Sequence, residues 1–299
     1  MPRVSYTAPA TVDEAVKALA GAAGLARVLS GGTDLLVQMK SGRVKPEVIV
    51  DTKHIPGLIG IREEGDCFVI GAATPGAMIS ADERLERAFP GIVEGVDLIG
   101  STQIQGRASI AGNLCNASPA ADSVPPVIAA RATAVIVGPN GRREVPVEAI
   151  VTGPGRTSLA KGELVVEFRI PKPKPRQSDA YLRFIPRTEM DIAVVGCAVN
   201  VTLDGNGVCT DARVVLGAVA PTQLIVAGAA EALIGRKLDD DTLARLDSAA
   251  QAACHPITDK RGTIEYRTKV AGVLARRAAA IAFERAGVRP QSDSIPGAI

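Results

Sequence analysis

Apolar side chains recur every three to four residues in two stretches of the chain, which predicts an amphipathic helix in each. The first helix begins at the Thr11-Val12-Asp13-Glu14 capping box and ends at Gly21. The second is the long final helix, from about Thr263 to Ala286, with Gly287 after it. Shorter helices are expected at residues 35–42, 223–233 and 241–253.

Short apolar runs between turn residues predict strands in the rest of the chain. The expected strands cover residues 26–29, 48–51, 67–72, 133–137, 164–170, 192–203 and 213–219. Pro139-Asn140-Gly141 and Asp204-Gly205-Asn206-Gly207 supply turn chemistry. Residues 99–122 show neither period and are rich in Gly, Ser, Asn and Pro, so we expect a long loop there. A loop of that length in a compact domain is usually functional.

This order of elements divides the chain into three parts. A βαβ-like lobe covers residues 1–57 and is closed by the Ile55-Pro56-Gly57 turn. A second α/β lobe covers residues 58–175 and ends in the Pro171-Lys172-Pro173-Lys174-Pro175 linker. A third domain, residues 176–299, combines paired strands with helices.

Composition restricts the classes of partner. Lys and Arg number 34 against 32 Asp and Glu, which leaves a net charge of +2, and aromatic residues make up 3% with no Trp. The small net charge does not favour binding to a nucleic acid or an anionic membrane. The scarcity of aromatic rings also disfavours stacking on nucleic-acid bases. The N-terminus lacks the apolar core of a signal peptide, and the longest uncharged run, Val214–Ala230, contains Pro221. We expect a cytoplasmic protein without membrane insertion.

The chain offers little catalytic or metal-binding chemistry of its own. Its five cysteines are scattered without a CxxC pair, and its two histidines, His54 and His255, lie outside any metal-ligand spacing. We expect no metal site and no catalytic residue. Cys115 is interpreted as a small packing residue, because no histidine lies near it in the sequence. The run Asp239-Asp240-Asp241 is expected to cap a helix and fill its first turn.

Two segments with small residues could hold a ligand. Leu29-Ser30-Gly31-Gly32-Thr33-Asp34-Leu35 sets two glycines at a strand-to-helix junction, where bare backbone N–H groups can approach a phosphate. It matches neither the Rossmann nor the P-loop pattern, and a plain turn is the alternative. The second segment, Gly106–Asp122, has a polar surface loop as its alternative. Its fixed polar side chains are those of Ser109, Asn113, Asn116 and Asp122.

Together, LSGGTDLL (Leu29–Leu36) and ASIAGNLCNASPAAD (Ala108–Asp122) resemble the two FAD-binding segments of one protein family. That family is the FAD-binding medium (flavoprotein) subunit of the molybdenum hydroxylases, of the xanthine dehydrogenase and carbon monoxide dehydrogenase type. The similarity extends over nearly the whole chain and includes RGTIEYRTKVAGVLARRA (Arg261–Ala278). The resemblance implies an α+β fold, with a two-lobed FAD-binding domain of the vanillyl-alcohol-oxidase/PCMH type plus a C-terminal domain with a small antiparallel sheet and helices.

The resemblance also implies which residues bind FAD. The first segment would embrace the pyrophosphate, and the second would contact the diphosphate, ribitol and flavin. Leu164 and Val165 would abut the flavin or adenine side, and Arg183 would lie near the isoalloxazine. The implied set is Leu29, Ser30, Gly31, Gly32, Thr33, Asp34, Leu35, Ile99, Gly100, Ser109, Ile110, Ala111, Gly112, Asn113, Asn116, Asp122, Leu164 and Arg183.

The sequence departs from the family pattern at one position. Where the family usually reads TIGG, this chain has Ser109-Ile110-Ala111-Gly112, so Ala111 replaces the first glycine. If that position needs a positive φ, an alanine there costs about 1 kcal/mol. The scattered cysteines disfavour a related reductase subfamily that carries an extra iron–sulfur cluster in this subunit.

The family implies an electron-transfer role. A large molybdopterin subunit would oxidise the substrate, a small subunit with [2Fe–2S] clusters would pass the electrons on, and the FAD of this chain would reduce an external acceptor. A dimer of such heterotrimers is expected. The alternatives are a flavin-free structural subunit of the same kind of complex and a free-standing FAD oxidoreductase.

Overall fold

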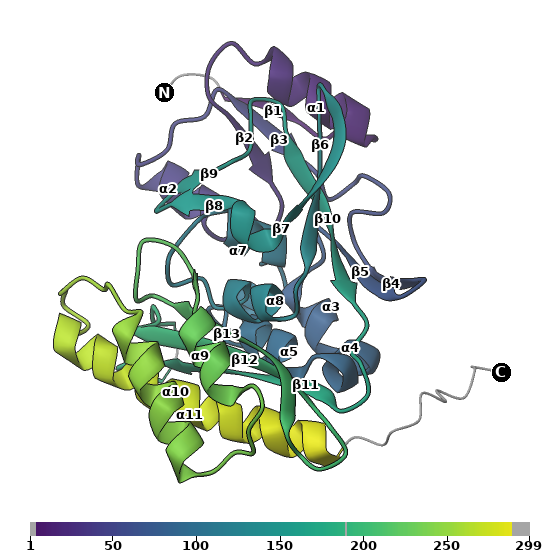
Figure 1. The fold of residues 1–299 in the computed structure, drawn as a ribbon. Coiled ribbons are helices and arrows are strands. Elements are labelled where there is room, and N and C mark those ends of the chain that lie inside the picture. Colours follow the sequence, from purple (N-terminus) through teal and green to yellow (C-terminus); the bar gives the residue numbers. More distant parts are fainter. Residues whose placement is uncertain (1–3, 189, 289–299) are drawn as a thin grey trace.

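The computed structural model describes residues 4–188 and 190–288. They form three larger β-sheets with helices packed on them, and the sheets follow one another along the chain (Figure 1). The first is a parallel sheet in the order β1-β3-β2. Its strands and helices are β1 (Ser5–Thr7), α1 (Val12–Gly21), β2 (Ala26–Leu29), α2 (Leu35–Lys40) and β3 (Val48–Asp51).

Helix α1 forms as its sequence predicts. The Thr11 hydroxyl caps it by accepting a hydrogen bond from the Glu14 N–H at 3.2 Å. The apolar face of α1, with Val16 and Leu19, is buried in one core cluster with Val50 of β3 and Val166 of the next sheet. The helix therefore joins the first sheet to the second.

The second sheet has five antiparallel strands, in the order β4-β5-β10-β6-β7. The strands are β4 (Ile61–Glu64), β5 (Cys67–Gly71), β6 (Thr133–Gly138), β7 (Gly141–Pro146) and β10 (Leu164–Pro171). Between β7 and β10 lie a 3-10 turn (Val147–Ala149) and the ribbon β8 (Val151–Gly153) with β9 (Arg156–Thr157). The Pro139-Asn140-Gly141 turn joins β6 to β7, as predicted.

Six short helices lie between β5 and β6. They are α3 (Gly76–Ser80), α4 (Glu83–Ala88), α5 (Pro90–Asp97), α6 (Thr102–Gln105), α7 (Ile110–Cys115) and α8 (Val124–Ala129). Side chains such as Ile92 of α5 and Leu114 of α7 share a core with Phe68 and Phe168 of the sheet. The prediction of a continuous loop over residues 99–122 is therefore wrong, because α6 and α7 lie within it. Helices of four and six residues are too short to show a helical period.

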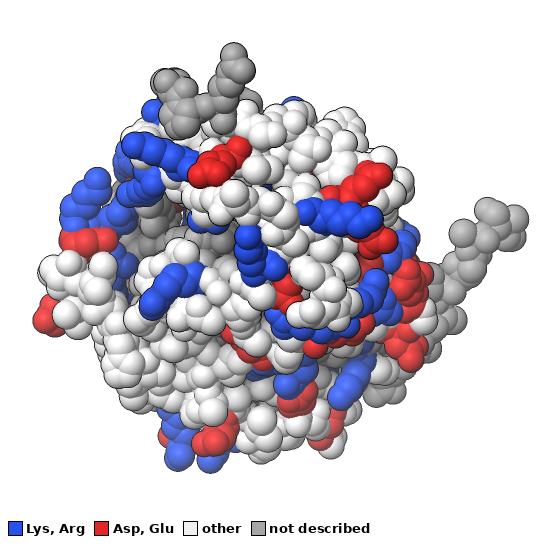
Figure 2. All heavy atoms as spheres, turned by 90° about the horizontal axis from the view of Figure 1, so that it is seen from above, with Lys and Arg blue, Asp and Glu red and all other residues white. Residues whose placement is uncertain are grey.

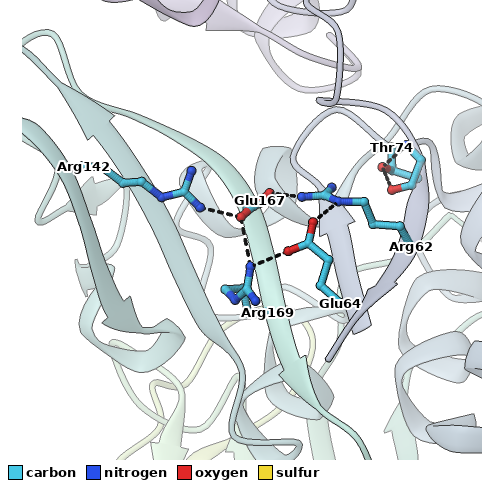
Figure 3. A network of polar contacts seen from close by, with 7 residues as sticks. Arg62, Glu64, Thr74, Arg142, Glu167 and Arg169 are labelled. Carbon is cyan, nitrogen blue, oxygen red and sulfur yellow. Dashed lines mark hydrogen bonds and ion pairs between the residues drawn. The ribbon is translucent and has the colours of Figure 1, made fainter. Parts of the chain in front are cut away.

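The other face of the second sheet carries a charged network (Figure 3). The buried Glu167 carboxylate of β10 accepts hydrogen bonds at 2.6 Å from Arg62 of β4 and from Arg142 of β7. Glu64 pairs with Arg62 and with Arg169, at 2.6 and 2.9 Å. The network therefore links three strands across the sheet.

The third sheet is antiparallel, in the order β11-β12-β13-β14. Its strands are β11 (Gln177–Phe184), β12 (Val195–Leu203), β13 (Cys209–Gly217) and β14 (Leu224–Ile225), and its helices are α9 (Ala227–Leu233), α10 (Asp240–Ala252) and α11 (Ile264–Val288). The helix expected at 223–233 thus starts only at Ala227, because β14 precedes it. Asp239 caps α10 by accepting a hydrogen bond from the Thr242 N–H at 2.8 Å, which confirms its expected role.

The third sheet lies between two helical layers. Fully buried alanines of α11, including Ala275 and Ala278, let this helix pack closely against β11 and β12. The opposite face packs on α5 and α8 of the preceding part of the chain (Figure 1). This contact places β11 beside the second of the two candidate ligand segments.

Seen from the end that carries the first sheet, the described surface has both basic and acidic side chains among uncharged areas (Figure 2). Within the described ranges, none of the helices has the length and apolar character needed to cross a membrane.

Candidate functional site

The two candidate ligand segments meet in the structure, although 79 residues separate their central serines. The Ser30 and Ser109 hydroxyl oxygens lie 3.0 Å apart in a hydrogen bond. A Cβ on Gly31 would lie 2.0 Å from the main-chain oxygen of Arg107, closer than any real contact. Only glycine at position 31 permits this approach.

Main-chain N–H groups accumulate where the two segments meet. In the described part of the chain, no main-chain N–H of residues 30–34 donates a hydrogen bond. The same holds for Ile110 and Ala111, which are buried in the first turn of α7. N–H groups in such positions need an acceptor from elsewhere, and an anionic oxygen is a suitable one. The arrangement favours a phosphate-bearing ligand.

A cavity of about 300 Å³ lies beside these groups. Its lining residues are Leu29, Gly31, Gly32, Thr33, Leu36, Lys53 and Arg107. Among the described residues, the Arg107 side chain has no acidic partner, so its charge is available to a ligand. The sequence did not single out Lys53 or Arg107, because a scattered basic residue carries no spacing signal.

Lys53 is held at the cavity by a short polar chain. Its ammonium group contacts both Asp51 carboxylate oxygens, at 2.7 and 2.8 Å, and the Tyr6 hydroxyl donates to the same carboxylate at 2.8 Å. Burial acts to raise the pKa of Asp51, but the hydrogen bonds from Lys53 and Tyr6 outweigh it and lower the pKa. Asp51 is therefore ionised at neutral pH and anchors the lysine.

The second segment is ordered by its own side chains. Ser109 caps α7, with its hydroxyl accepting a hydrogen bond from the Gly112 N–H at 3.1 Å. Ala111 lies inside α7 and has no positive φ. An alanine at this position therefore causes none of the backbone strain that a positive φ would bring. Asn113 accepts a hydrogen bond from the Ser123 hydroxyl at 2.8 Å. Asn116 accepts one from Gln38 of α2 at 2.9 Å, which ties the segment to the first sheet.

A second group of expected residues gathers around Asp122. The Arg183 guanidinium of β11 donates to Asp122 at 2.7 Å and to the Leu98 carbonyl oxygen at 2.7 Å. The half-buried Ile99 and Gly100 follow Leu98 directly, and Gly100 has a φ of 61°. Burial raises the pKa of Asp122, although Arg183 and Tyr181 counteract it. The sequence did not single out Tyr181, whose hydroxyl also donates to Asp122, at 2.8 Å.

Other expected residues lie apart from these two groups. Leu164 is buried in the core that contains α1, and Val165 in the core on the opposite face of the sheet. Asp34 lies at the start of α2, where partial loss of hydration raises its pKa. Cys115 is on the solvent-exposed side of α7, yet the protein packed around its sulfur raises the pKa of the thiol to about 12. A protonated thiol is a poor nucleophile.

The residues present fit a phosphate-bearing flavin cofactor. The free N–H groups, Lys53 and Arg107 suit a diphosphate. Near Asp122, the buried Nε of Arg183 has no hydrogen-bond partner within the described residues, which leaves a donor for a ligand acceptor. In the same described ranges, no group of three or more His, Cys, Asp or Glu side chains could hold a metal ion.

Comparison with known proteins agrees with this chemistry. Residues 2–173 match the family described as the FAD binding domain in molybdopterin dehydrogenase. The chain belongs to this family. Residues 180–282 match the CO dehydrogenase flavoprotein C-terminal domain. The resemblance seen in the sequence is thereby confirmed, as are the mixed α/β fold with its C-terminal domain and the cofactor, FAD.

Relatives of this FAD-binding subunit match over almost their full length. The carbon monoxide dehydrogenase medium chain of Hydrogenophaga pseudoflava is 36% identical over 95% of this chain and 98% of its own. The xanthine dehydrogenase FAD-binding subunit of Escherichia coli O157:H7 is 31% identical over 96% and 98%. A solved structure of the Hydrogenophaga carbon monoxide dehydrogenase superposes with a TM-score of 0.91, covering 95% of this chain and 98% of that one. These matches favour the electron-transfer subunit over both alternatives.

Proposed function

We propose that the FAD diphosphate lies where the two segments meet, against the N–H groups of Ser30–Asp34 and of the first turn of α7. The single observation that supports this most is the set of unpaired N–H groups beside a cavity that also contains Lys53 and Arg107. Anionic oxygens would satisfy donors that the protein leaves unpaired.

The flavin end of FAD would then lie toward Asp122. Asn113 and Asn116 would lie along the ribitol, and Ile99, Gly100 and Arg183 beside the isoalloxazine. When bound, FAD supplies the redox chemistry, which the chain's own side chains do not offer. The task of these residues is to bind and orient the cofactor and to set its electrostatic surroundings. Leu164 would support the site from the sheet behind it.

The chain would act as one subunit of a larger enzyme. Relatives are named as the medium chain or as one subunit of a dehydrogenase complex. We infer a large molybdopterin subunit and a small [2Fe–2S] subunit as partners, with electrons passing from the small subunit through FAD to an external acceptor. A dimer of heterotrimers in the cytoplasm is part of this proposal, as is the division into residues 1–57, 58–175 and 176–299.

The Arg107→Gln variant tests the diphosphate site. Because its charge has no acidic partner among the described residues, we expect FAD binding by the apo-protein to weaken about 10-fold, as for one charge-assisted hydrogen bond. FMN carries no diphosphate and should bind more weakly than FAD. Its affinity should therefore change less than that of FAD in the Arg107→Gln variant. Arg87→Gln is the matched control, since Arg87 is exposed on α4. Equal FAD affinity of Arg107→Gln and the control would contradict the proposed location.

A further inference from the structure

Tyr181 is a buried residue whose hydroxyl contacts Asp122, the residue toward which the flavin is proposed to lie. Its side chain is 2% exposed, and the hydroxyl donates to Asp122 Oδ1 at 2.8 Å. Arg183 donates to the other carboxylate oxygen, Oδ2, at 2.7 Å. Residues 181 and 183 share one face of β11, because side chains alternate along a strand. The two side chains therefore hold both oxygens of Asp122 from the same face.

The neighbouring strand leaves space for this phenol. Gly196 of β12 pairs with Arg183 in the sheet, and a Cβ at position 196 would lie 2.4 Å from the Tyr181 hydroxyl oxygen. Gly196 has no positive φ, so its backbone conformation does not require glycine. A larger side chain at position 196 would therefore displace the Tyr181 hydroxyl.

The same cluster connects three parts of the chain that the proposed site uses. Arg183 joins Asp122 of the second segment to the Leu98 carbonyl, directly before Ile99 and Gly100. Its Nε remains buried without a partner among the described residues. An acceptor on a ligand bound beside the cluster would satisfy this donor.

We propose that Tyr181 is a positioning residue that holds the Asp122 carboxylate in the orientation in which it meets the flavin. This inference rests on the proposed function, because it requires FAD in the site. Tyr181 itself need not touch the cofactor. Burial and the Asp122 carboxylate raise the pKa of Tyr181 well above its usual range, so the phenol remains a neutral hydrogen-bond donor at physiological pH.

The reduction potential of bound FAD tests this role in a Tyr181→Phe variant of the full chain. The change removes one donor from Asp122 while the Arg183 ion pair stays. The negative charge on Oδ1 is then less compensated, which disfavours the uptake of electrons by a neighbouring flavin. We expect a lower reduction potential and a shifted visible absorption band. Tyr266→Phe is the matched control, since the Tyr266 ring is 44% exposed and contacts Phe184.

The Gly196→Ala variant provides an independent test. Its methyl group would displace the Tyr181 hydroxyl from Asp122, so we expect the potential to shift in the same direction. A potential that is unchanged or raised in Tyr181→Phe, while wild type and Tyr266→Phe bind FAD normally, would overturn the positioning role, even if the melting temperature fell. Failure of the wild-type chain to bind FAD would instead contradict the proposed function.

Discussion

At the scale of single residues, the sequence predicted that the glycine pair of the first segment lets backbone N–H groups approach a phosphate. The structure adds that Gly31 approaches the main chain at Arg107. Local spacing could not reveal this contact, because it joins residues that are far apart in the chain. Tyr181 was missed for the same reason, because its partner Asp122 lies in another part of the sequence. Lys53 was missed because a scattered basic residue carries no spacing signal, although its partner Asp51 is only two residues away.

Replacing Gly31 by alanine tests the junction of the two segments. The added methyl group would overlap the Arg107 carbonyl, so the segments must separate. We expect a loss of about 2 kcal/mol in the free energy of unfolding, as for other overpacked sites, and at least a 10-fold weaker FAD affinity. Urea unfolding and FAD titration measure the two effects.

The control is Gly21→Ala at the end of α1, where a Cβ meets nothing within 4 Å. Alanine favours a helix there, so the control should be as stable as the wild type or slightly more so. If Gly31→Ala behaved like the control in both measurements, the close contact between the two segments would be needed neither for stability nor for FAD binding.

At the scale of elements, the strands that the sequence predicted are those with apolar runs, such as β3, β5 and β10. Strands β4 and β7 were missed because charged residues fill them, as in Ile61-Arg62-Glu63-Glu64. Both are edge strands of the second sheet, where charged side chains are common. Arg62 of β4 and Arg142 of β7 are paired with the buried Glu167 across the sheet. The charged residues of β4 and β7 are explained by the order of strands in the sheet. That order depends on long-range pairing and could not be read from the local sequence.

The Glu167→Gln variant tests the network in Figure 3. The change removes the charge that balances Arg62 and Arg142, so the guanidinium groups would repel each other across the sheet. We expect the free energy of unfolding to fall by about 2 kcal/mol, because the arginines lose a buried partner. Hydration of the half-exposed arginines keeps the loss from being larger. Glu83→Gln on α4 is the control, since its pair with Arg87 is exposed and should contribute less than about 0.5 kcal/mol. Equal urea midpoints for the two variants would show that the network is not stabilising.

At the scale of the whole molecule, the two segments at their separation identified the family and hence the cofactor. The assembly of the site could not be read from the sequence. Helix α1 packs the first sheet onto the second, and α5 and α8 pack against the third. Through the second contact, β11 supplies Arg183 and Tyr181 to the region around Asp122. Residues from all three parts of the chain thus surround the proposed cofactor position.

We expect this chain to bind FAD with the residues of the two segments and of β11. Titration of the purified apo-protein with FAD, followed by heat release and mass measurement of the bound cofactor, tests this binding most directly. We predict saturation at one FAD per chain, with the flavin absorption bands shifted from those of free FAD, and tighter binding of FAD than of FMN. A chain that is purified without flavin and shows no saturable FAD binding would contradict the account.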